Sequence, residues 1–171
     1  TSADELFTGY YDHFLLHLNS VIRCSRYPHY LEDWENNILQ FVRNPILTNP
    51  NLYDESPDFR EHVYDNSAAF VDYLEVPFGE FFTEEYFANS LLRSRMMNEL
   101  FHEVTPVILH EDDLNSMLYS IENRSPYLDS RLFEFTYSIP DEYLIQDGYG
   151  KYILRESMKG ILNDTVRLER R

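Results

Sequence analysis

The first residues of the chain combine a helix start with a carboxylate. Ser2 and Glu5 have the spacing of a capping box, in which each side chain accepts a hydrogen bond from the backbone amide of the other residue. The unpaired amides and partial positive charge of a helix start also favour a phosphate. Asp4 beside them could hold a magnesium ion that bridges to such a phosphate. The pattern therefore leaves two interpretations open, a well-formed helix start or an anion site with a metal ligand.

Residues 113–129 are the second segment whose side chains could carry chemistry. The segment is dense in polar groups yet includes apolar side chains. Because buried charged groups need partners, we expect fixed partners for Glu122 and Arg124. One interpretation is a buried polar network that locks a turn before the next helix. The other places Glu122 at a cleft, as a general base or a proton-relay carboxylate.

The sequence gives little support for a metal site on a histidine pair, a glycine-rich nucleotide loop or a disulfide. His13 and His17 lie four residues apart, but only Asp12 is close in sequence and no third ligand stands out, so a half-exposed aromatic helix face is favoured over a metal pair. The five glycines form neither a Walker A loop nor a dinucleotide fingerprint. Cys24 is the only cysteine, which excludes an internal disulfide.

Helical spacing of apolar residues dominates the chain, and no convincing alternating strand occurs. The asparagine-, aspartate- and proline-rich stretches between the apolar stripes are expected to be loops. The sequence therefore predicts a mainly α array. Helices are expected over 6–22, 31–41, 58–63 with Ser56 as N-cap, 91–101, 132–136 after the capping pair Asp129–Ser130, and 151–159 with Gly160 in the left-handed closing position.

Length and charge limit the function classes. A chain of 171 residues suits one domain or part of one. Its net charge of −16 argues against nonspecific binding to nucleic acid or an anionic membrane. No apolar run approaches the ~18 residues of a membrane span, and no signal peptide is visible, so we expect a cytoplasmic protein. Residues 151–171 carry an excess of basic side chains, which could face an anionic ligand or form a solvated helix face.

Three segments resemble motifs of the asparagine synthetase family. Residues 2–10 are similar to G-A-D-E-L-F-G-G-Y, residues 115–129 to N-S-M-A-x-S-x-E-x-R-x-P-F-L-D, and residues 147–156 to D-G-x-x-K-x-x-L-R-E. The motifs occur in the family's order and cover the start of the chain and residues 110–160. Residues from about 25 to 100 match none of them and are expected to form a family-specific helical insertion.

The resemblance implies that residues 1–171 are a single partial domain, the helical C-terminal portion of an α/β ATP-pyrophosphatase (PP-loop) synthetase domain. It implies that the S-G-G-x-D-S loop that grips ATP, and an N-terminal glutaminase domain, precede these residues in the same polypeptide. A pyrophosphate-contacting lysine is expected just beyond Arg171. The 171 residues alone are therefore expected to be inactive.

The activity implied by the resemblance is ATP-dependent amide formation. The family joins a carboxylate to AMP, releases pyrophosphate and lets ammonia from glutamine displace AMP, with ATP and Mg²⁺ as cofactors. By position, Asp4 matches the aspartate that binds magnesium and pyrophosphate. Glu5 matches its neighbour, which is expected mainly to cap the helix and is also a candidate cofactor-binding residue. Glu122 matches a carboxylate that is structural in many members and resembles the catalytic one of β-lactam-forming relatives. A small carboxylate substrate is implied, and a homodimer stays open.

Several residues depart from the family pattern. Thr1 stands where asparagine-forming members often have glutamate, Leu114 replaces an arginine, and Thr8 replaces a glycine of F-G-G-Y. These departures put aspartate in doubt as the substrate and make a sugar uronic acid an alternative. Two further alternatives are a non-catalytic helical interaction module that retains the synthetase scaffold, and a stand-alone acidic helical domain with a chance resemblance.

Overall fold

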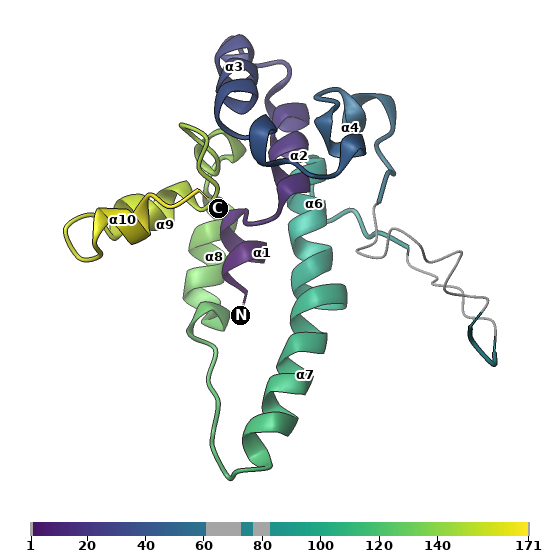
Figure 1. The fold of residues 1–171 in the computed structure, drawn as a ribbon, viewed down its shortest axis with the longest axis vertical. Helices are drawn as coiled ribbons and strands as arrows, with labels where there is room; N and C mark the ends of the chain where they lie inside the picture. The colour runs from purple at the N-terminus through teal and green to yellow at the C-terminus, as the bar shows by residue number, and fades with distance from the viewer. Residues whose placement is uncertain (1, 61–72, 77–82, 171) are drawn as a thin grey trace.

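The structure is a computed structural model that describes residues 2–60, 73–76 and 83–170 (Figure 1). Within these ranges it is mainly helical and contains only two isolated β-bridges, so the mainly α prediction is confirmed. No helix in the same ranges is long and apolar enough to cross a membrane. The α-helices are α1 (Ala3–Phe7), α2 (Tyr11–Val21), α3 (Tyr27–Asn37), α4 (Leu52–Glu55), α6 (Leu91–Asn98), α7 (Val104–Met117), α8 (Ser130–Ser138), α9 (Tyr152–Ser157) and α10 (Asp164–Arg167).

Helix α2 lies at the centre of the core, against α3, α4 and α6. Its leucines Leu15, Leu16 and Leu18 are fully buried, and Trp34 of α3 and Met96 of α6 pack into the same cluster. Short 3₁₀ helices over Leu39–Phe41, Pro45–Thr48, Pro126–Leu128 and Asp141–Tyr143 connect the larger elements.

The apolar stripe expected as one helix over 6–22 is broken between α1 and α2. Thr8 adopts a left-handed φ of 66°, and its buried hydroxyl donates to the carbonyl oxygens of Phe7 and Leu144. The backbone amide of Lys151 also donates to the Phe7 carbonyl, at 2.8 Å. A distant segment therefore satisfies the end of α1, and the chain turns at Gly9 instead of continuing the helix.

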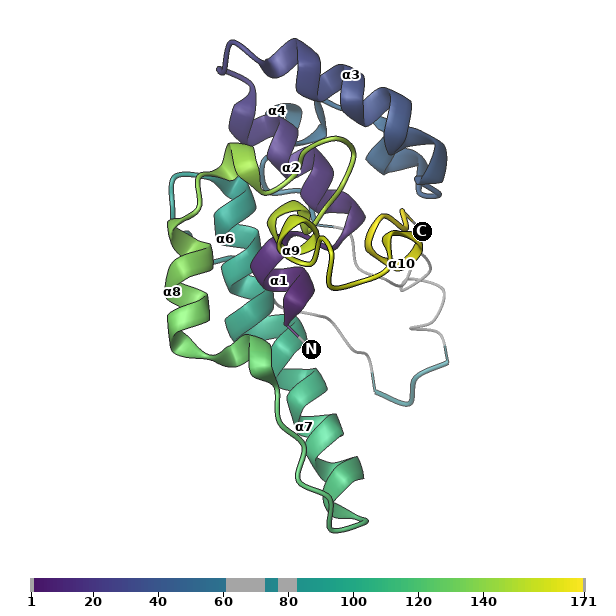
Figure 2. The same cartoon turned by 90° about the vertical axis from the view of Figure 1, so that its left-hand side faces the viewer.

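Helix α6 runs into a π-helical turn, Glu99–Glu103, and then into α7. Figures 1 and 2 show α7 reaching well beyond the helices that surround α2, with the following segment returning from its far end to α8. The outer part of α7 exposes Val107, Leu114 and Met117. The helix expected over 91–101 is therefore confirmed, with a local change of hydrogen bonding at Glu99.

The remaining helix predictions had mixed outcomes. Helix α8 begins where expected, with the Asp129 side chain accepting from the Arg131 amide at 2.9 Å. Gly160 has the expected left-handed φ of 78°. The helix expected over 31–41 begins earlier, at Tyr27, and gives way to a 3₁₀ turn after Asn37. The helix expected over 58–63 is absent at residues 58–60, and residues 61–63 lie outside the described ranges.

The two histidines of α2 are buried, so the half-exposed aromatic face expected there is wrong. His13 is fully buried and lies 2.8 Å, Nε2 to Oε2, from Glu99. His17 packs edge-on against Tyr30, with ring centroids 5.3 Å apart. Burial lowers the pKa of His17 to about 4.

The lowered pKa of His17 gives a pH-dependent stability. Below pH 6.5 the unfolded state takes up a proton that folded His17 accepts only near pH 4, so stability falls as the pH drops through this window. Between pH 7 and 5 we expect the native protein to lose about 2 kcal/mol more than a His17→Phe variant. Denaturant unfolding measures this difference. His110→Gln, at an exposed histidine, should keep the native pH slope, and an equal slope in His17→Phe would contradict the assignment.

Candidate functional site

A pocket of about 260 Å³ opens beside the turn between α1 and α2. Its walls come from α1, the following turn, α2, the 3₁₀ helix Leu39–Phe41, the segment 148–151, α9 and the end of the described chain. Charged side chains from both ends of the sequence meet in it. The lining residues are Asp4, Thr8, Gly9, Tyr11, Phe14, Ile38, Phe41, Gly148, Tyr149, Gly150, Lys151, Arg155 and Arg170.

Asp4 and Lys151 form an ion pair on the pocket wall, with Oδ1 and Nζ 2.6 Å apart. Lys151 has a left-handed φ of 56°, and its amide donates to the Phe7 and Thr8 carbonyl oxygens. A side chain at Gly150 would bring its Cβ to 2.5 Å from the Thr8 carbonyl. These close backbone contacts place the 147–156 motif directly against the 2–10 motif.

Gly9 leaves the space that the Asp4 side chain occupies. A Cβ at this position would lie 1.6 Å from Asp4 Oδ1 and 2.7 Å from Asp4 Cβ. The absence of a side chain at Gly9 therefore fixes how the carboxylate lies in the pocket.

Gly9→Ala is expected to displace the Asp4 carboxylate from Lys151 and to weaken any function of that carboxylate by about tenfold or more. Because Asp4 Cβ cannot move without the backbone of α1, the turn must also shift, and the melting temperature should fall as well. Activity and thermal melting of the complete protein measure the two effects. Gly160→Ala is the control, since its methyl group meets nothing within 4 Å and strains only a remote turn. Unchanged activity in Gly9→Ala would show that the Asp4 position is unimportant.

The far wall of the pocket carries two arginines beside one aromatic ring. The guanidinium carbons of Arg155 and Arg170 lie over Tyr149, at 5.3 Å and 4.3 Å from the ring centroid. Burial lowers the pKa of Arg155 below its usual value. With Lys151, the pocket presents three cationic groups and the single carboxylate of Asp4, so its lining favours an anion.

Glu5 lies behind the pocket, not in it. It is 2% exposed, and its Oε1 accepts from the Tyr10 hydroxyl at 2.6 Å. Burial, followed by this hydrogen bond, raises the pKa of Tyr10, so the phenol stays a donor. Ser2 has a left-handed φ and makes no capping bond, so the capping box is wrong. Through its hydrogen bond with Tyr10, the Glu5 side chain instead stabilises the turn from α1 to α2.

Glu122 does not line this pocket. It lies on the segment after α7, with 73% of its side chain exposed, and pairs with Arg124 at 2.9 Å. The two residues pair with each other, but both are exposed, so the buried network expected around them is wrong. The α7 extension carries this segment away from the core (Figure 2). The structure brings Asp4 to Lys151 and does not bring it to Glu122.

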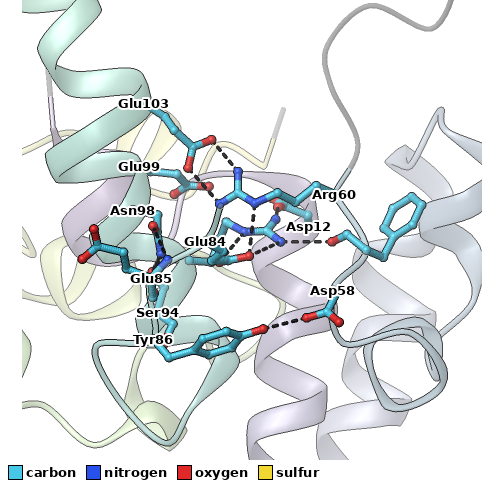
Figure 3. Close-up of polar contacts among 12 residues, drawn as sticks. Asp12, Asp58, Arg60, Glu84, Glu85, Tyr86, Ser94, Asn98, Glu99 and Glu103 are labelled. Carbon is cyan, nitrogen blue, oxygen red and sulfur yellow. Dashed lines mark hydrogen bonds and ion pairs between the residues drawn. The ribbon is translucent and has the colours of Figure 1, made fainter. Parts of the chain in front are cut away.

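A second charged cluster joins α2 to α6 (Figure 3). Arg95 donates to Asp12 at 2.9 Å and to Glu84 at 3.1 Å, while Arg60 pairs with Glu103. Donor atoms of Asp12, His13 and Glu99 lie within 4.8 Å of one another, as in some metal sites. Asp12 already binds Arg95 and His13 already binds Glu99, so these contacts account for the cluster as packing between helices.

Comparison with known proteins gives a consistent answer. The family model described as asparagine synthase matches residues 1–171. The chain belongs to the asparagine synthase family. Asparagine synthetase [glutamine-hydrolyzing] 3 of Bacillus subtilis (strain 168) is 41% identical over 59 residues, which are 34% of this chain and 10% of that protein. Asparagine synthetase [glutamine-hydrolyzing] 1 of the same strain is 39% identical over 59 residues, 34% of this chain and 9% of the relative.

The alignments therefore span about a tenth of these relatives. No solved structure matches the chain. In this chain, residues 2–10 and 147–156, which are two of the three motif segments, both line the pocket. The third, with Glu122, remains apart.

Lys151, Arg155 and Arg170 are pocket residues that the sequence did not single out. Two signals pointed towards them. Lys151 and Arg155 lie inside the D-G-x-x-K-x-x-L-R-E motif, and all three contribute to the basic excess over 151–171. Neither signal specifies that these side chains face Asp4, which is 147 residues away from Lys151 in the chain.

Proposed function

We propose that this chain is the helical C-terminal part of a PP-loop synthetase domain in an ATP-dependent, amide-forming enzyme. In this proposal the complete enzyme adenylates a small carboxylate, releases pyrophosphate and aminates the product with ammonia from glutamine. The observation that carries the proposal is the pocket in which Asp4 meets Lys151. Membership of the asparagine synthase family supports it.

The donor set fits magnesium held together with a phosphate. Mg²⁺ is usually bound by one or two carboxylates, with substrate phosphates and waters completing its shell. Asp4 supplies one partly exposed carboxylate at the edge of an otherwise cationic pocket. When bound there, the ion would neutralise charge that develops on the departing phosphate oxygens.

The chain's own groups would assist the same step. The Lys151 ammonium, held between Asp4 and the pocket, is placed to donate to a phosphate oxygen. Its backbone bonds to Phe7 and Thr8 fix its position before the reaction, and such preorganised charge lowers the barrier when negative charge develops. Glu5, through Tyr10, would hold the Asp4 turn in place.

The remaining parts of the proposal concern the complete protein. The exposed segment around Glu122 also exposes Leu118, Tyr119 and Ile121, which supports contact with an upstream PP-loop half. In that assembled state Glu122 is proposed as the catalytic carboxylate. An N-terminal glutaminase domain would supply ammonia, and the proposal places the enzyme in the cytoplasm.

Carboxylate-dependent exchange of label between pyrophosphate and ATP tests the proposed function. The complete protein should catalyse exchange with Mg²⁺ and either aspartate or a sugar uronic acid, and should form the amide when glutamine or ammonia is added. Thr1, in place of the usual glutamate, favours the uronic acid. Absence of exchange with every carboxylate, in a folded protein, would favour the alternative of a non-catalytic helical interaction module.

A further inference from the structure

We infer that Arg155 and Arg170 form a second anion position in the pocket. When a diphosphate is bound, one of its phosphates contacts Lys151 and this second position holds the other. This inference rests on the proposed function, because it takes the diphosphate as the ligand. It adds that the ligand is bound at two positions: Lys151 with Asp4 binds one end, and the two guanidinium groups bind the other.

In the described part of the chain, the charge of Arg155 is only partly offset, by the attraction of the Glu169 carboxylate. Among the described residues, neither arginine has a carboxylate partner within ion-pair distance. Arg155 donates to the carbonyl oxygens of Gly150 and Arg167, and Arg170 to Asn37 Oδ1 and the Asp147 carbonyl. These neutral acceptors orient the two guanidinium groups without cancelling their charge.

Three arginines that are more deeply buried than Arg155 and Arg170 are neutralised by carboxylates. Arg93 pairs with Asp141, Arg95 with Asp12 and Glu84, and Arg167 with Glu156 and Asp164. In a chain with more than twice as many acidic as basic residues, carboxylate partners are abundant. Two adjacent and incompletely compensated cations on a pocket wall therefore indicate that an external anion belongs there.

The charged surface is also held in a fixed shape. Both guanidinium groups rest over the Tyr149 ring, which restricts their rotation and lowers the entropy cost of binding. Guanidinium groups bind phosphate oxygens through paired N–H donors, whereas an ammonium acts as a point charge. A pocket of about 260 Å³ with an ammonium and a guanidinium pair as separate contacts suits a ligand with two anionic groups.

Binding of inorganic pyrophosphate and of orthophosphate to the complete protein, with Mg²⁺ present, tests the inference by calorimetry. Arg170→Gln should weaken pyrophosphate binding about tenfold or more and leave orthophosphate binding nearly unchanged, because a single phosphate occupies the Lys151 end. Lys151→Met should weaken both. Lys159→Gln removes the same charge at an exposed position outside the pocket and should weaken neither.

The outcomes separate this inference from the proposed function. If Lys151→Met weakens pyrophosphate and Arg170→Gln does not, the second anion position is wrong and the proposed function stands. If neither substitution matters, or the native protein binds no pyrophosphate, both fail. A raised KM for the carboxylate substrate in Arg170→Gln, with pyrophosphate binding unchanged, would assign the arginines to the substrate and also overturn the inference.

The conservative variant Arg170→Lys tests the same position in case Arg170→Gln does not fold. It keeps the charge but removes the paired donors, so a smaller loss confined to pyrophosphate is expected. Thermal melting of each variant shows whether the fold is intact. If Arg170→Gln does not fold, unchanged pyrophosphate binding by a folded Arg170→Lys would overturn the inference.

Discussion

Asp4→Asn in the complete protein should reduce carboxylate-dependent ATP–pyrophosphate exchange by about a hundredfold or more. The substitution keeps the size of the side chain but removes its charge, so both the proposed magnesium ligand and the counterion of Lys151 are lost. Because the carboxylate is partly exposed and near the end of a short helix, the fold should persist. Initial rates of exchange over a range of Mg²⁺ concentrations measure the effect, and the Mg²⁺ requirement should rise.

Asp113→Asn is the matched control for this experiment. It removes the same charge from an exposed position on α7, outside the pocket, and should leave exchange at the native level. Native exchange rates in Asp4→Asn would remove Asp4 from the metal role. The pocket would then have to be explained without a role for this carboxylate.

Arg93→Met should destabilise the fold by about 3–5 kcal/mol. Arg93 is almost fully buried, and its guanidinium pairs with Asp141 at 2.8 Å while donating to the carbonyl oxygens of Thr136 and Ile139. Methionine fills much of the same space but leaves the Asp141 carboxylate and two carbonyl oxygens without their partner. The loss affects the junction of α6, α8 and the 3₁₀ helix Asp141–Tyr143.

Urea unfolding of the complete protein, with a probe in this domain, measures the loss. Arg131→Met is the control, because Arg131 pairs with Asp129 on the exposed surface and should leave the unfolding midpoint unchanged. A similarly small effect for Arg93→Met would show that the buried ion pair is not needed and that the junction is held by apolar contacts alone.

Local spacing was sufficient to predict most helices. The apolar repeat of α2 and the Asp129 cap of α8 are encoded within a few residues, so pattern and capping rules find them. The break between α1 and α2 is different. The apolar repeat runs through Thr8, and the chain turns there because Leu144 and Lys151, far along the sequence, complete its hydrogen bonds.

The site was predictable only in part, for the same reason. Asp4 could be singled out from its place at a helix start and from the motif that contains it. The contact between Asp4 and Lys151 depends on the packing of segments 147 residues apart, which spacing does not encode. The exposure of Glu122 likewise depends on α7 extending past the core, and the sequence pattern predicted no helix over 104–117.

A crystal structure of the complete protein with Mg²⁺ and pyrophosphate would test the central claim most directly. We expect the diphosphate in the pocket between α1 and α9, with the metal bound to an Asp4 oxygen and Lys151 donating to a phosphate oxygen. A diphosphate bound elsewhere, with Asp4 and Lys151 still paired to each other and their pocket filled by side chains of another domain, would contradict it.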